Sequence, residues 1–189
     1  PGIAEAYASG QRALREHADV DSVAAGRPGS SAYQGLPELL VTDAENFLAE
    51  PALHAEVFGA TSLVVRCADL DQLHLAVNSL EGQLTATVHA APVDHADARK
   101  LVTTLERKVG RILFNGWPTG VEVGHAMVHG GPFPATSDSR TTSVGSLAID
   151  RFLRPVSYQD VPADLLPSAI ADGNPDNIWR RVDGSLTQE

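Results

Sequence analysis

The chain has 189 residues, a formal net charge of −10 and a sequence pI near 5.0. That excess of negative charge repels nucleic acid and anionic membrane surfaces, so neither is expected as a partner. No run of apolar residues is long enough for a membrane span, and the amino end does not read as a signal segment. The single cysteine, Cys67, excludes an intramolecular disulfide and suits a reducing compartment. We therefore expect a soluble cytoplasmic protein.

The first part of the chain alternates apolar, polar and turn-forming stretches. Ile3, Tyr7 and Leu14 recur at helical spacing, which favours one amphipathic helix. The Gly/Ser/Pro-rich composition of residues 24–34 is typical of a loop. The elements predicted before residue 50 are a helix over 2–17, a loop over 24–34, a strand over 36–41 and a brief helix capped by Thr42 or Asp43.

The pattern then becomes regular over residues 62–115. The predicted strands are 62–66, 83–89 and 110–115, and the predicted helices are 69–80 and 94–109. Strand, helix, strand, helix, strand in this order implies neighbouring parallel strands joined by right-handed crossovers. The fold class expected is α/β, a mostly parallel sheet with flanking helices.

The character of the chain changes after Asn115. Residues 116–145 are rich in Gly, Pro, Ser and Thr, and a loop of that length inside a compact domain is usually functional. Residues 146–159 are predicted to form a short helical stretch and then an extended segment that leaves the domain to pair with a neighbouring subunit. The polar tail after Pro162 has Trp179 as its only large anchor.

The residues alone supply no complete catalytic set. His125 and His129 have the spacing of two helical metal ligands, but Ala126 stands where a metalloprotease needs glutamate, so no metal site is expected. Cys67 ends an apolar strand and is interpreted as a small buried hydrophobe with an unactivated thiol. No glycine-rich phosphate loop opens a helix, so the chain is not expected to contain a dinucleotide-binding fold of its own.

Several segments resemble the aldehyde dehydrogenase superfamily, in that family's order. They are Glu56-Val57-Phe58-Gly59 before the strand SLVV, the strand that ends at Asn115, and the turn His129-Gly130-Gly131. A more detailed resemblance, to the α-ketoglutaric semialdehyde (2,5-dioxovalerate) dehydrogenase group, lies in residues 82–90, 110–145, 151–159 and 177–184. It covers almost the whole chain, and the 36-residue block over 110–145 is highly specific.

The resemblance implies a C-terminal portion of a longer enzyme. Residues 1–149 would be the later part of the catalytic domain, 150–165 an oligomerisation arm and 166–189 a C-terminal tail. The catalytic cysteine and the general-base glutamate of the family would precede this chain, as would its cofactor domain, so no catalytic residue is expected here. The parent enzyme would be a homo-oligomer, a dimer or a tetramer, that oxidises a small aldehyde acid through a cysteine thioester.

Family chemistry also implies binding roles for residues of this chain. With NAD or NADP as cofactor, Glu56 would accept hydrogen bonds from the nicotinamide ribose hydroxyls, and Phe58 would pack beside the nicotinamide. The residues expected to line the aldehyde tunnel are Trp117, Gly120, Val121 and His129. The alternative interpretation of these four residues is that they only pack within their loops.

Two positions depart from the family pattern. Ala60 replaces the usual proline after Phe-Gly, and Thr141 follows Arg140 where many members carry a glutamate linked to proton relay. The proline that would stiffen the turn before the strand, and so aim Glu56, is therefore absent. The glutamate of the family's proton relay is absent as well. Two alternatives stay open: a non-catalytic binding or oligomerisation module with the same fold, and a hydrolase that uses His125 and His129.

Overall fold

A computed structural model describes residues 2–27, 29–31 and 33–189. It divides into two compact units, Pro1–Arg151 and Phe152–Glu189, each of which is described by itself. Two residues of the predicted loop over 24–34, Pro28 and Ala32, lie outside the described residues.

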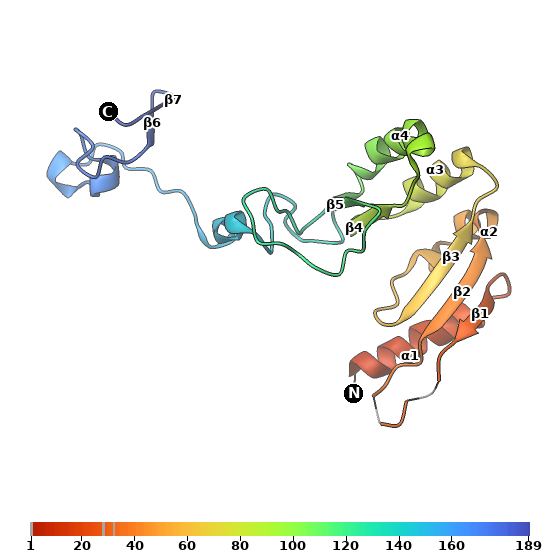
Figure 1. The fold of residues 1–189 in the computed structure, drawn as a ribbon. Coiled ribbons are helices and arrows are strands. Elements are labelled where there is room, and N and C mark those ends of the chain that lie inside the picture. Colours follow the sequence, from red (N-terminus) through yellow and green to blue (C-terminus); the bar gives the residue numbers. More distant parts are fainter. Residues whose placement is uncertain (1, 28, 32) are drawn as a thin grey trace. The chain divides into compact units, whose positions relative to one another are not determined.

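The first sheet of the larger unit has three strands in the order β1 (Asp21–Ala25), β2 (Glu38–Asp43) and β3 (Thr61–Arg66) (Figure 1). β1 pairs with β2 antiparallel, and β2 pairs with β3 parallel. Helix α2 (Ala44–Ala49) and the 3-10 helix Pro51–His54 connect β2 to β3. The central strand β2 is the most buried, and its Leu40 is 0% exposed at the centre of the first core cluster.

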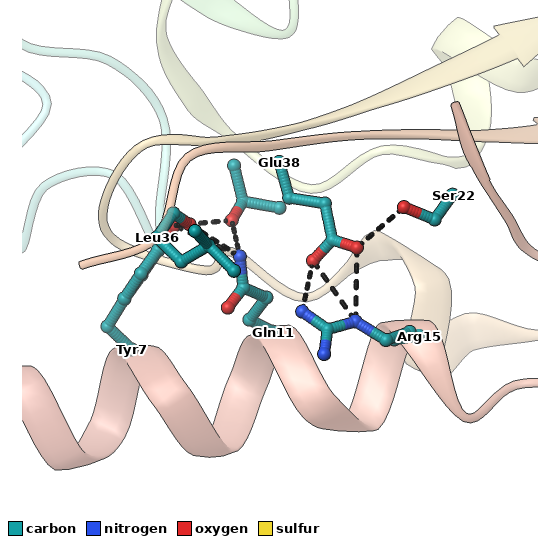
Figure 2. A network of polar contacts seen from close by, with 7 residues as sticks. Tyr7, Gln11, Arg15, Ser22, Leu36 and Glu38 are labelled. Atoms are coloured by element: carbon teal, nitrogen blue, oxygen red, sulfur yellow. Dashed lines mark hydrogen bonds and ion pairs between the residues drawn. The ribbon is translucent and has the colours of Figure 1, made fainter. Parts of the chain in front are cut away.

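Helix α1 (Gly2–Arg15) is held against the first sheet by polar as well as apolar side chains. Figure 2 shows Tyr7, Gln11 and Arg15 pointing from one face of the helix toward the start of β2. Arg15 donates to both carboxylate oxygens of Glu38, with Nη2 2.6 Å from Oε2, and Ser22 of β1 donates to the same carboxylate at 2.7 Å. The Glu38 side chain is 2% exposed, so this carboxylate is both buried and fully engaged.

The second sheet consists of β4 (Gln83–Val88) and β5 (Val109–Phe114), which pair parallel. Helix α4 (His95–Leu105) provides the crossover between them and packs on them through a second core cluster. Helix α3 (Leu70–Ser79) links the two sheets, because its Ala76 belongs to the first cluster and its Val77 packs against the second. The Asp69 side chain caps α3 by accepting from the Gln72 amide at 2.8 Å.

The prediction of neighbouring parallel strands over residues 62–115 is confirmed for β4 and β5 and is wrong for β3 and β4. Among the described residues, β3 and β4 share no hydrogen-bonded pair, although they follow each other in the chain. β1 was missed because its five residues are all exposed, so they carry no alternation of apolar and polar side chains. Helix α4 ends at Leu105, and the apolar residue Val109, assigned to its inner face, instead begins β5.

Two smaller expectations are also corrected. Asp43 precedes α2 but makes no side-chain cap, because its carboxylate pairs with Arg66 at 2.9 Å. Trp179 does not anchor the tail, since 64% of its surface is exposed. The tail is instead organised by the buried Asn174, whose amide donates to the carbonyls of Ile178 and Gln188.

Of the remaining segments, residues 116–145 are irregular, as predicted, whereas the tail contains a hairpin that was not predicted. Residues 116–145 contain no helix or strand among the described residues, and a 3-10 helix covers Ser146–Phe152. The smaller unit starts with a stretch that is neither helix nor strand and ends in the hairpin of β6 (Arg180–Val182) and β7 (Ser185–Thr187). Within the described chain, no helix is long and apolar enough to cross a membrane.

The buried Glu38 predicts a pH-dependent loss of stability in the variant Arg15→Met. The hydrogen bond from Arg15 lowers the pKa of Glu38 against the opposing effect of burial. A lowered folded-state pKa stabilises the protein above the ordinary carboxyl pKa, and this stabilisation disappears as pH falls through the folded-state value. Arg15→Met should therefore melt several degrees below the unaltered protein at neutral pH, and the difference should shrink in acid.

Thermal melts across the acid range, followed by circular dichroism, measure this difference. The control is Arg66→Met, which removes the exposed pair with Asp43 and should leave the melting temperature nearly unchanged. A deficit in Arg15→Met that stays constant from neutral pH to acid would contradict the role given to Glu38.

Candidate functional site

The segment that carries Glu56 and Phe58 connects the 3-10 helix Pro51–His54 to β3 and lines a cavity of about 500 Å³. Both side chains are exposed, Phe58 to 75%, whereas Val57 between them is half-buried. The other walls of the cavity are mainly aliphatic, with Leu14, Leu53 and Leu63 among them. One carboxylate and one aromatic ring thus line a hollow whose other side chains are mainly aliphatic.

This arrangement suits a ligand with hydroxyl groups and a flat ring. An ionised carboxylate accepts hydrogen bonds only, and it can take two hydroxyl donors at once. An exposed aromatic ring beside it offers a face for stacking. Glu56 and Phe58 therefore line one cavity, and their predicted role at a cofactor stays a prediction.

Three of the predicted tunnel residues lie in one loop after β5. Arg111 of β5 orders this loop by donating from Nη1 to the Gly120 carbonyl at 2.8 Å and from Nη2 to the Pro118 carbonyl at 3.1 Å. Trp117 is 78% exposed, and its ring centroid lies 5.6 Å from that of His89. Val121, next to Gly120, is half-buried. The loop thus presents a large indole side chain on a backbone braced by one arginine.

His129 lies apart from these residues, in a polar cavity of about 280 Å³. Its amide donates to the Thr142 hydroxyl at 2.8 Å, and its carbonyl accepts from the Ser143 hydroxyl at 2.8 Å. Its Nδ1 atom is buried and has no hydrogen-bond partner among the described residues. The cavity is completed by Thr136, Ser137, Asp138, Thr141 and Arg151. The structure therefore does not bring His129 into one cavity with the other predicted residues.

An ion pair borders the His129 cavity. Arg140 donates from Nε to Asp138 at 3.0 Å, and this hydrogen bond lowers the pKa of the Asp138 carboxyl. Thr141, which stands in place of the glutamate common in the family, donates to the Asp138 carbonyl at 3.4 Å. Its hydroxyl thereby braces the loop, a role that needs no ionisable group.

The turn at Gly130-Gly131 is fixed by close backbone packing. A Cβ atom on Gly110 would collide with the carbonyl of Gly130, and one on Gly131 would collide with that of Gln83. Gly131 also has a φ of 151°, which disfavours any other residue. The backbone of the turn therefore packs directly on the first residues of β4 and β5. Side chains in place of these glycines would prevent this close approach.

Sequence patterns do not single out the neighbours that surround these residues. Leu53 and Leu63 look like ordinary core residues, and Arg111 looks like a solvated strand end. Arg151 gave no signal beyond its charge. Of these neighbours, only Leu53 could have been inferred from the sequence, because it lies close to Glu56 in the chain.

The remaining chemical candidates are ordinary side chains in the structure. Cys67 follows β3 and packs against the first core cluster, and burial raises the pKa of its thiol, with the nearby Asp69 adding to the effect. His125 lies in a turn, not on a helix, so the helical spacing with His129 does not apply. Among the described residues, no three His, Cys, Asp or Glu side chains gather where a metal ion could bind.

Two curated relatives match almost the whole chain. Over 183 residues the chain is 53% identical to alpha-ketoglutaric semialdehyde dehydrogenase 2 of Azospirillum brasilense, covering 97% of this chain and 35% of the relative. It is 48% identical over 188 residues to alpha-ketoglutaric semialdehyde dehydrogenase of Acinetobacter baylyi, covering 99% of this chain and 36% of the relative. No family model matches the chain.

By sequence, the chain is similar to α-ketoglutaric semialdehyde dehydrogenases. It spans about a third of the length of the curated relatives that it matches. The solved structures agree on the fold: Delta-pyrroline-5-carboxylate dehydrogenase of Mycobacterium tuberculosis superposes with a TM-score of 0.62 at 17% identity, over 88% of this chain and 31% of that one. The structure of the same enzyme bound with NAD gives a TM-score of 0.59 at 18% identity, over 87% and 30% of the two chains. The resemblance and the α/β fold class predicted from the sequence are confirmed.

The raised pKa of Cys67 predicts an unreactive thiol. In the folded protein at neutral pH, alkylation of Cys67 by iodoacetamide should be at least about tenfold slower than alkylation of free cysteine, because little thiolate is present. Mass spectrometry of the Cys67 peptide over time measures this rate. The same reaction in concentrated urea is the control and should be fast. Rapid alkylation of Cys67 in the folded protein would contradict this prediction and would make Cys67 a candidate nucleophile.

Proposed function

We propose that this chain supplies the cofactor-facing and substrate-facing part of an NAD(P)-dependent dehydrogenase that oxidises a small aldehyde acid, α-ketoglutaric semialdehyde, to the corresponding diacid. The observation that carries the proposal is the shared cavity of Glu56 and Phe58, in a chain 53% and 48% identical to two enzymes of that name. The proposal assigns the nucleophilic cysteine and the general base to parts of the gene product outside this chain, which alone would be inactive.

The residues at the cavity fit a nicotinamide dinucleotide. Glu56 would accept hydrogen bonds from two ribose hydroxyls, and the exposed Phe58 ring would lie beside the nicotinamide. The aliphatic wall formed by Leu14, Leu53 and Leu63 excludes water from that side. When bound, the cofactor supplies the hydride acceptor. The work of this chain is to orient the cofactor, since a misplacement of the reacting atoms by about 1 Å can slow a reaction by two orders of magnitude.

The loop after β5 would face the aldehyde. Trp117 offers a broad apolar surface that shields the reacting carbon from solvent, and Arg111 keeps the backbone at Gly120 in place. Val121 would add a small apolar contact. His129 would contribute its imidazole from the polar cavity and, with Arg151 at the same cavity, would favour a carboxylate group of the substrate.

Glu56→Gln tests the cofactor role in the complete gene product. A hydrogen bond to a charged group contributes about 1.5–3 kcal/mol, so hydride transfer or cofactor affinity should fall about ten- to a hundredfold. Stopped-flow formation of reduced cofactor and fluorescence titration with NAD+ and NADP+ measure the two quantities. Glu50→Gln changes an exposed glutamate outside the cavity and is the matched control. Kinetics that are unchanged in Glu56→Gln would remove Glu56 from the cofactor site.

A non-catalytic module with the same fold is the second candidate. It is favoured by the absence of a suitable nucleophile among the described residues, where the thiol of Cys67 has a raised pKa. The intact mass of the protein made by its native host separates the two candidates. A mass well above the 20.0 kDa of this chain supports the dehydrogenase, and a mass of 20.0 kDa favours the module.

We also propose that the segment around residues 151–160 forms an intersubunit strand of a homo-oligomer. Residues 153–159 form neither helix nor strand, and within the described chain their backbone amides and carbonyls form no hydrogen bond with another backbone group. By the two-residue period of a strand, Val156 and Tyr158 share one face, and both are exposed. An unpaired strand with an apolar face is suited to add to the edge of a sheet in a second copy.

Val156→Asp tests the intersubunit strand. The buried charge that it would create should dissociate subunits, which sedimentation velocity of the complete gene product would report as a smaller species. Gln159→Asp places the same charge on the opposite face of the segment and should leave the assembly intact. An unchanged sedimentation profile for Val156→Asp would contradict the proposed strand.

A further inference from the structure

Tyr7 of α1 is in direct contact with the segment that carries Glu56 and Phe58. Its side chain is 6% exposed, and its ring lies between two glycines. A Cβ atom on Gly35 would come within 2.6 Å of the ring, and one on Gly59 would overlap it as well. Because neither glycine has a side chain, the ring reaches the backbone of the segment itself.

The hydroxyl group of Tyr7 fixes the far end of the same segment. It donates to the Leu36 carbonyl at 2.6 Å, so its oxygen is left to accept from the Thr61 hydroxyl, 2.9 Å away. Gln11 supports this arrangement by donating from Nε2 to the Leu36 carbonyl at 2.7 Å (Figure 2). Thr61 directly follows Ala60, so the end of the segment is tied to α1 through a buried hydroxyl.

A third contact comes from the next turn of α1. A Cβ atom on Gly10 would lie 3.1 Å from the side chain of Val57, which shows how closely the helix backbone approaches that residue. The contacts to α1 therefore fall on alternate residues, Val57, Gly59 and Thr61. Glu56 and Phe58, which alternate with them, are exposed at the cavity.

We propose that Tyr7 is a positioning residue that sets the direction of Glu56 and Phe58; this inference rests on the cofactor role proposed for the two. The usual proline of the family would stiffen the turn after Gly59, because its ring fixes φ near −65°. Ala60 imposes no such restriction. In this chain the ring and hydroxyl of the buried Tyr7 restrain the turn after Gly59 in place of a proline.

The test uses the complete gene product with three substitutions. Tyr7→Leu removes both ring and hydroxyl and should slow hydride transfer or weaken cofactor affinity about ten- to a hundredfold through misplacement of Glu56 and Phe58. Leu105→Ala, in the second core cluster, is the control for lost stability and should leave both quantities unchanged after allowance for unfolded protein. In the Tyr7→Leu background, Ala60→Pro should restore a large part of the loss, since it stiffens the same turn.

The outcomes separate the two proposals. Should Tyr7→Leu fail to fold, Tyr7→Phe keeps the ring and loses only the hydroxyl, and the same quantities should then fall about two- to tenfold. Normal cofactor kinetics in a folded Tyr7 variant, beside impaired Glu56→Gln, would overturn the positioning role and leave the proposed function standing. Normal kinetics in Glu56→Gln as well would overturn the cofactor site itself. A loss that Ala60→Pro does not relieve at all would overturn the restraint of the turn.

Discussion

The packing of α1 on the start of β2 is the interaction on which the larger unit depends most. Glu38 is buried at the first residue of the central strand, and only the hydrogen bonds from Arg15 and Ser22 make an ionised carboxylate tolerable there. The same helix face carries Tyr7, which reaches the segment before β3. The central strand and the candidate site are therefore both fixed by one helix.

The helix α3 has a comparable role between the two sheets. Each sheet has its own apolar cluster, and α3 contributes to both through Ala76 and Val77. Strands β3 and β4 do not pair in the described chain, so the helix and not a ladder of hydrogen bonds connects the sheets. The contacts of α3 with both clusters therefore hold the two sheets together.

The sequence allowed the strands and helices over residues 61–114 to be predicted within a few residues, because their apolar periodicity is strong. It could not reveal which strands pair, since pairing depends on long-range packing. β1 was missed because none of its residues is buried. For the site, the family resemblance singled out Glu56 and Phe58, which are close in sequence and line one cavity, whereas the cavity of His129 depends on a loop of 30 irregular residues, 116–145, whose course no local pattern specifies.

The order of contacts along the chain has a consequence for synthesis on the ribosome. Every residue of the first core cluster, from Leu14 to Ala76, lies in the first 80 residues, as do the partners of Tyr7 and Arg15. Chains fold from the amino end as they emerge, so α1 and β1–β3 can assemble before β4 and β5 have left the exit tunnel. The segment bearing Glu56 is then already held by α1 while the loop bearing Trp117 is still being made.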